Sequence, residues 1–229
     1  MANTIFIYTT LAVSILTLLL AEIWAVSQKS RSLADVLFAK GQFAVLNSRH
    51  LSGIVVFLIC CWCYTASSEA DTSIFEPAWS DEWSVICIAI TIVAMTTGFM
   101  SAGNRRIMQQ RFTARVPATG VSIICYLLLR VIFLLFYEFF FRGVLLFTFI
   151  AETTVLTAIG INILLYALLH CYSNRKELIG TFPFGLLLCV VTLLHHSVWP
   201  AVIIHLALAM SHEIKLVFIN QSPLKSSQL

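Results

Sequence analysis

The chain has 229 residues, of which 59% are hydrophobic and only 11% are charged, and its formal net charge at pH 7 is +3. A soluble domain carries about twice that charged fraction, so this composition excludes a globule covered by water. Lipid accepts an apolar exterior, and the sequence therefore predicts an integral membrane protein. No stretch combines basic residues with stacking aromatics, so we expect no nucleic-acid partner.

Seven apolar stretches approach or exceed the length of about 20 residues that a helix needs to cross a bilayer. In chain order they are Thr4–Val26, Leu51–Ala66, Trp83–Ser101, Gly120–Ile150, Thr153–Cys171, Leu178–Leu194 and Trp199–Ile219. The fourth is too long for one untilted crossing. The first has no Lys or Arg before it, unlike a secretory signal, so we expect an uncleaved span. The sequence predicts an all-α, polytopic bundle of about seven transmembrane helices.

The charges between these stretches alternate in sign along the chain. The first loop is mainly basic, with Lys29, Arg31, Lys40 and Arg49. The second is acidic, with Glu69, Asp71, Glu76, Asp81 and Glu82. The charged residues of the third are all arginines: Arg105, Arg106, Arg111 and Arg115. Basic loops stay in the cytoplasm. The alternation therefore predicts an N-terminus outside and a C-terminus, with Lys225, in the cytoplasm.

Six ionisable side chains within the apolar stretches are candidates for membrane depth: Glu22, Arg130, Glu138, Arg142, His170 and His205. Each costs roughly 3 kcal/mol or more at membrane depth, so each needs a partner or a function. We expect Glu22, near a span end, to reach the interface, and Arg130 to do the same or to pair with an acid. Glu138 and Arg142 are four residues apart on one helix, within pairing reach, and alone they would indicate a structural ion pair.

The spacing of the second-half residues predicts their depths. Glu138 and His170 are equidistant from the polar break Ala151–Thr154, so a helical hairpin would bring both to one level, about 24 Å from the turn. His205 lies six residues after Trp199 and fits this level less well. We expect the loop His195–Pro200 to be sunk into the bundle, because the span before it is short.

Three motifs occur in order: Y-E-F-F-F-R-G at Tyr137–Gly143, Y-A-L-L-H at Tyr166–His170 and S-V-W-P-A-V-I-I-H-L-A-L-A at Ser197–Ala209. Together they resemble the CPBP family of intramembrane proteases, which includes type II CAAX prenyl proteases and bacteriocin-processing proteins. The family pattern is E-E-x-x-x-R, then F-x-x-x-H, then H-x-x-x-N. The resemblance covers about residues 120–209.

The resemblance implies a seven- or eight-helix bundle around a cavity open to the membrane. It implies that the first Glu and the first His activate water, and that the last His and the Asn stabilise the oxyanion. On this pattern the catalytic candidates are Glu138, Arg142, His170 and His205. If the protein is active and a divalent metal such as zinc takes part, His170 and His205 are its candidate ligands.

This sequence departs from the pattern at two chemical positions. Tyr137 occupies the place of the first Glu, and Ala209 that of the Asn. A tyrosine hydroxyl, with an unperturbed pKa near 10, is a poor base at neutral pH. The hypothesis we favour is a degenerate protease that binds a membrane peptide or acts as a subunit of a membrane complex.

Two alternatives stay open. One is an active intramembrane endopeptidase with Glu138 as base, although one position along a helix rotates a side chain by about 100°; His212, seven residues after His205, could then supply a missing group. The other is a transporter, which would show repeats in its two halves; none is visible in the sequence.

The chain divides into three predicted parts. Residues 1–118 hold the first three spans and their loops, residues 119–221 form the CPBP-like core, and residues 222–229 are a polar tail. The expected partners are membrane lipid, a membrane-associated peptide or protein, and other membrane subunits. The expected location is the bacterial inner membrane.

Overall fold

The structure is a computed structural model that describes residues 2–38, 41–67, 70–78, 81–109, 119–172 and 175–221. All regular structure in these ranges is helical, which confirms the predicted fold class. The elements are α1 (Ala2–Ser27), α2 (Leu33–Phe38), α3 (Phe43–Thr65), η1 (Thr72–Phe75), α4 (Asp81–Gln109), α5 (Gly120–Glu138), η2 (Phe139–Leu145), α6 (Leu146–Glu152), α7 (Val155–Leu169), α8 (Arg175–His195) and α9 (Trp199–Gln221).

Six helical segments of the described chain are long and apolar enough to cross a membrane: Tyr8–Ser27, Phe43–Thr65, Asp81–Ala102, Gly120–Glu152, Arg175–His195 and Trp199–Gln221. α7 is a shorter apolar helix that makes a seventh span plausible. The chain is thus a multi-pass integral membrane protein, as its composition predicts. Its orientation stays a prediction, because several of the loop charges lie outside the described residues, or have side chains that do: Lys40, Glu69, Arg105, Arg106, Arg111, Arg115 and Lys225.

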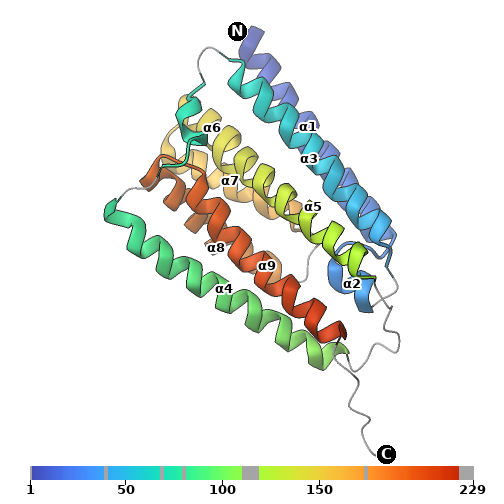
Figure 1. The fold of residues 1–229 in the computed structure, drawn as a ribbon. Helices are drawn as coiled ribbons and strands as arrows, with labels where there is room; N and C mark the ends of the chain where they lie inside the picture. Colours follow the sequence, from blue (N-terminus) through green and yellow to red (C-terminus); the bar gives the residue numbers. More distant parts are fainter. Residues whose placement is uncertain are drawn as a thin grey trace, which may run out of the picture.

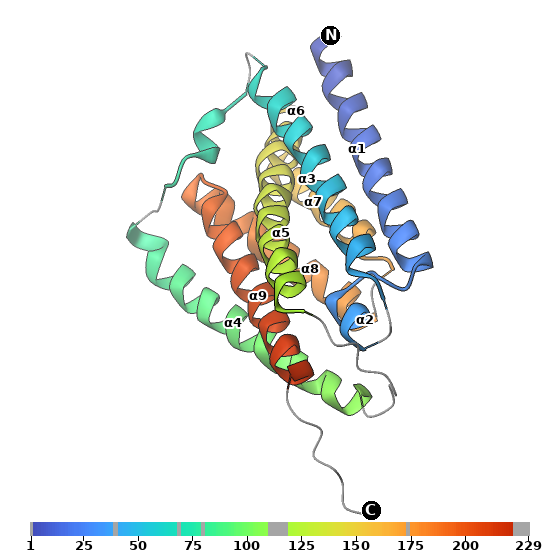
Figure 2. The ribbon, with the colours of Figure 1, turned by 45° about the vertical axis from the view of Figure 1, so that its right-hand side comes forward.

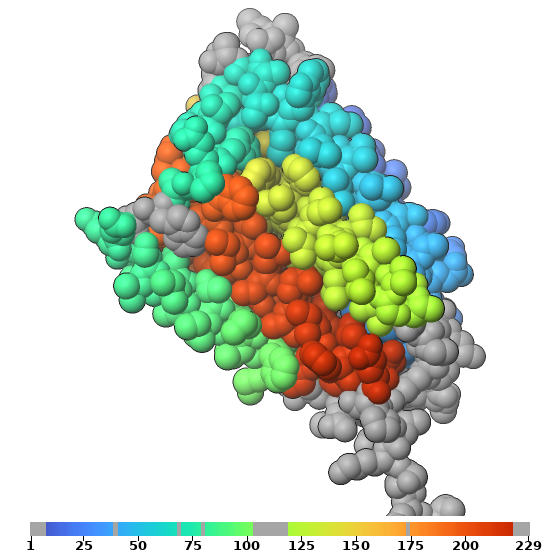
Figure 3. Space-filling view, viewed as in Figure 1, coloured from blue at the N-terminus to red at the C-terminus, as the bar shows by residue number. Residues whose placement is uncertain are grey.

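The helices run nearly side by side in a bundle (Figures 1 and 2). α3 packs between α1 and α5, α9 packs between α5 and α4, and α8 packs against both α9 and α7. Figure 3 shows the resulting face, on which α9 is exposed between α5 and α4. α5 therefore lies between α3 on one side and α9 on the other.

The predicted fourth span is one continuous rod of 33 residues, Gly120–Glu152, made of α5, η2 and α6. η2 is a π-helix, in which the Leu146 N–H donates to the carbonyl of Phe141 five residues earlier. That carbonyl also accepts from Nδ2 of Asn162 on α7, at 2.6 Å. Short π-helical segments are frequent at functional sites because they change the direction of the side chains that follow.

The loop between α8 and α9 is buried in part: Ser197 and Val198 are covered, whereas His196 is exposed. The preceding helix, Arg175–His195, has 21 residues and is not short, so the reason for the expectation is wrong. His195, Ser197 and Val198 are almost inaccessible. The η1 region covers them: the Val198 N–H donates to the Ile74 carbonyl at 3.0 Å, and Trp199 Nε1 donates to the Phe75 carbonyl at 2.9 Å. The η1 region thus packs over the first residue of α9.

Close packing of α4 on α9 depends on Gly98. A Cβ atom at position 98 would overlap the carbonyl oxygen of Leu208 and Oγ of Ser211, whereas one at Gly160 of α7 would meet nothing within 4 Å. We expect Gly98→Ala to lower the free energy of unfolding by about 1–3 kcal/mol through overpacking, measured by denaturant unfolding in detergent. Gly160→Ala is the matched control and should not destabilise. Equal stability of the two variants would contradict this packing.

Candidate functional site

Three ionisable side chains meet in the middle of the bundle. Glu138 is the last residue of α5, Arg142 lies in η2, and His205 lies on α9. His205 Nδ1 is 2.5 Å from Glu138 Oε1, and Arg142 Nε is 3.4 Å from Glu138 Oε2. An ionised carboxylate only accepts hydrogen bonds, so His205 donates from Nδ1. Glu138 therefore holds a partner on each of its two oxygens.

Arg142 is fully buried, and its guanidinium has no hydrogen-bond partner in the described part of the chain. It lies over two aromatic rings instead, 4.8 Å from the centroid of Tyr166 and 5.8 Å from that of Phe141. Gly185 leaves room beside it, because a Cβ there would lie 3.8 Å from Nη2. An unpaired buried cation is costly, so Arg142 depends on the charge of Glu138.

Tyr137 packs as a core aromatic residue. Its ring stacks on Phe141 with centroids 4.6 Å apart, and its centroid lies 5.5 Å from that of Phe57, 5.9 Å from that of Tyr166 and 5.9 Å from the ring centroid of His205. Its hydroxyl is buried and has no hydrogen-bond partner among the described residues. An aromatic ring therefore lies beside His205 at the position where the resemblance expects a carboxylate.

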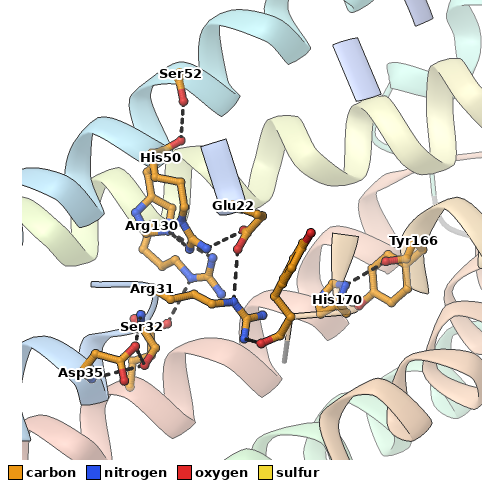
Figure 4. Close-up of polar contacts among 12 residues, drawn as sticks. Glu22, Arg31, Ser32, Asp35, His50, Ser52, Arg130, Tyr166 and His170 are labelled. Carbon is orange, nitrogen blue, oxygen red and sulfur yellow. Dashed lines mark hydrogen bonds and ion pairs between the residues drawn. The ribbon is translucent and has the colours of Figure 1, made fainter. Parts of the chain in front are cut away.

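His170 caps the end of α7, one turn beyond Tyr166. Its Nδ1 donates to the Tyr166 carbonyl at 2.9 Å, and the two rings lie 4.7 Å apart (Figure 4). Glu138 accepts a hydrogen bond from His205 and not from His170. The expectation that His205 fits the level of Glu138 less well is wrong. The contact between His205 Nδ1 and Glu138 Oε1 places the two residues at one level.

The remaining candidates lie outside this cluster. His212 Nδ1 is 2.7 Å from Oγ of Ser101 on α4. Ala209 follows His205 by one turn of α9 and offers no donor. Arg130 pairs with Glu213 at 3.0 Å, which confirms that it has an acidic partner. Glu22 pairs with Arg31 and Arg49.

The described residues contain no group of three or more His, Cys, Asp or Glu side chains arranged to hold a metal ion. His205 and His170 each use Nδ1 within the protein, for Glu138 and for the Tyr166 carbonyl. They could offer only their Nε2 atoms to an ion. The two histidines do not make the three-ligand set that a catalytic zinc ion takes.

One polar residue of this region is absent from the sequence-based candidates. Asn162 is completely buried on α7 and donates to the π-helical Phe141 carbonyl. Its Oδ1 is 3.4 Å from Sγ of Cys189 on α8. An uncharged amide in an apolar stretch indicates a functional site less strongly than a charged side chain does. A buried amide nevertheless also needs hydrogen-bond partners.

The three motifs lie in the segment that matches a known family. Residues 119–210 match the family model described as type II CAAX prenyl endopeptidase Rce1-like. This segment is thus similar to the CPBP family. No curated protein and no solved structure gives a significant match to the chain. The CPBP family motifs thus coincide with the buried cluster of Glu138, Arg142 and His205.

Removing one partner of the Glu138–Arg142 pair should cost far more than removing both. We expect Glu138→Leu or Arg142→Met alone to lower the free energy of unfolding by about 3–5 kcal/mol, because each leaves a buried polar or charged group unpaired. The double variant should cost clearly less than the sum. Denaturant unfolding in detergent measures all three, with exposed Arg175→Met as control. Additive losses would contradict a mutually dependent pair.

Proposed function

We propose that this CPBP-like protein is a degenerate intramembrane protease that binds a membrane peptide or serves as a subunit of a membrane complex. The observation that carries the proposal is the position of Tyr137. Its ring fills the space beside His205, and its hydroxyl is buried in an aromatic cluster. A phenol is a poor general base near neutral pH, so water activation lacks its carboxylate.

The contacts of Glu138 support the same proposal. One oxygen accepts from His205 and the other faces Arg142. The two oxygens therefore link α5 to η2 and to α9. Ala209, one turn after His205, has no group that could donate to an oxyanion. The retained ionic residues would then act as scaffold around a site that binds without cleaving.

Membrane lipid surrounds the protein in this proposal, and the bacterial inner membrane is its location. Large apolar side chains are exposed on most of the spanning helices, among them Leu16, Trp62, Val85, Leu128 and Phe218. Such a surface suits lipid tails, a transmembrane peptide or another membrane subunit. Nucleic acid is not among the proposed partners.

A second candidate function rests on the Glu138–His205 contact. The buried carboxylate of Glu138 lies 2.5 Å from the imidazole of His205. Carboxylates and imidazoles are the groups that most often transfer protons in general acid–base catalysis. In an active endopeptidase, Glu138 would orient His205, and His205 would polarise the attacking water. This alternative needs that water to reach His205 past the ring of Tyr137.

A cleavage assay distinguishes the two functions. The purified protein in nanodiscs is incubated with membrane-anchored peptides, and the products are measured by mass spectrometry. We expect no cleavage by the unchanged protein, by Glu138→Ala or by His170→Ala. Cleavage by the unchanged protein that both substitutions abolish would contradict the proposal.

A binding experiment supplies the positive outcome. We expect a membrane peptide or subunit to co-purify with the unchanged protein, with Tyr137→Phe and with Glu138→Leu/Arg142→Met, which keeps the site free of unpaired charge. Tyr137→Phe is the matched control, because it removes only the hydroxyl and keeps the ring.

A further inference from the structure

A second network of ionisable groups joins both halves of the chain near one end of the bundle (Figure 4). Glu22 of α1 accepts from Arg31 Nε at 3.1 Å and from Arg49 Nη1 at 2.5 Å. On α5, Arg130 Nε donates to Glu213 of α9 at 3.0 Å. Each guanidinium comes from a different segment of the chain, so the network depends on the tertiary fold.

His50 lies between two of these arginines. Its Nε2 is 3.3 Å from Arg49 Nη2 and 3.3 Å from Arg130 Nη1. Guanidinium groups donate and cannot accept hydrogen bonds, so Nε2 of His50 must be the acceptor of both. An imidazole that accepts on one nitrogen is neutral. Two cations therefore converge on a neutral group, with no carboxylate between them.

The carboxylates of the network do not neutralise the positive charge of the arginines around His50. Glu22 is shared between Arg31 and Arg49, and Glu213 contacts Arg130. Arg49 and Arg130 are close enough for their charges to repel, and repulsion is strong where water is scarce. Arg49 Nε is also buried without a hydrogen-bond partner among the described residues. The three arginines of the network thus outnumber its two glutamates, although Glu213 Oε2 is also buried without a hydrogen-bond partner among the described residues.

The two arginines that contact His50 are not completely buried. The side chains of Arg49 and Arg130 keep 12% and 19% of their accessible surface. Arg49 follows the start of α3 by six residues, and Glu22 precedes the end of α1 by five. At 1.5 Å per residue Arg49 and Glu22 lie about 8–9 Å from these helix ends, a depth that an arginine side chain spans toward the headgroups. Arg130 lies deeper, ten residues after the start of α5.

We infer that Arg49 and Arg130 bind a phosphate group, supplied by the headgroup of an anionic phospholipid. The planar guanidinium matches phosphate oxygens with two parallel hydrogen bonds. Basic pockets between transmembrane helices bind anionic headgroups for this reason. The bound phosphate neutralises the repulsion across His50 and fixes α3 against α5. This site is separate from the Glu138 cluster and does not depend on the function proposed for it.

Nanodiscs of neutral phosphatidylcholine with increasing phosphatidylglycerol test the inference. We expect phosphatidylglycerol to raise the temperature of unfolding of the unchanged protein and to remain bound in native mass spectrometry. Arg49→Gln should retain it about tenfold less strongly. Arg175→Gln, which removes an exposed arginine at the start of α8, is the control and should behave as the unchanged protein.

Two further arms keep the test decisive. If Arg49→Gln does not fold, Arg49→Lys keeps the charge without the planar donors and should also weaken retention. Inorganic phosphate, added to phosphatidylcholine nanodiscs, distinguishes the sources: an equal rise in unfolding temperature would assign the site to soluble phosphate. The inference is overturned if neither compound stabilises the unchanged protein, or if both Arg49 variants retain phosphatidylglycerol as Arg175→Gln does.

Discussion

The negative charge of Glu138 is shared between His205 on α9 and Arg142 in η2, and the centre of the bundle depends on this sharing. A lone carboxylate or a lone guanidinium is costly to bury at membrane depth. Here each compensates the other, and the histidine takes the remaining carboxylate oxygen. The arrangement explains how an Arg with no accessible surface and no hydrogen-bond partner among the described residues can persist in an apolar environment.

The surroundings of this cluster hold its members in place. The π-helix places Arg142 over the ring of Tyr166, and Asn162 takes up the Phe141 carbonyl within that π-helix. Tyr137 closes the side of His205 that faces α3. The same aromatic packing that stabilises the bundle thus occupies the place where the CPBP pattern has its first carboxylate, which links the stability of the scaffold to the proposed loss of activity.

The sequence predicts the helical class, the approximate spans and the Glu138–Arg142 pair, because hydropathy and a spacing of four residues depend only on local geometry. Its prediction of a loop sunk between α8 and α9 holds for Ser197 and Val198 but not for His196, which is exposed. It does not predict which histidine bonds Glu138, because that depends on how η1 covers the start of α9. The π-helix and the role of Asn162 are likewise tertiary effects. The network around His50 joins residues 22 to 213, a separation that no local pattern reveals.

An experimental structure of the protein in a lipid nanodisc tests the central claim most directly. We expect density for the Tyr137 ring beside His205, a continuous contact between His205 and Glu138, and Arg142 enclosed by aromatic rings. A Tyr137 ring turned away from His205, with a metal ion or an ordered water held between Glu138, His170 and His205, would contradict this expectation.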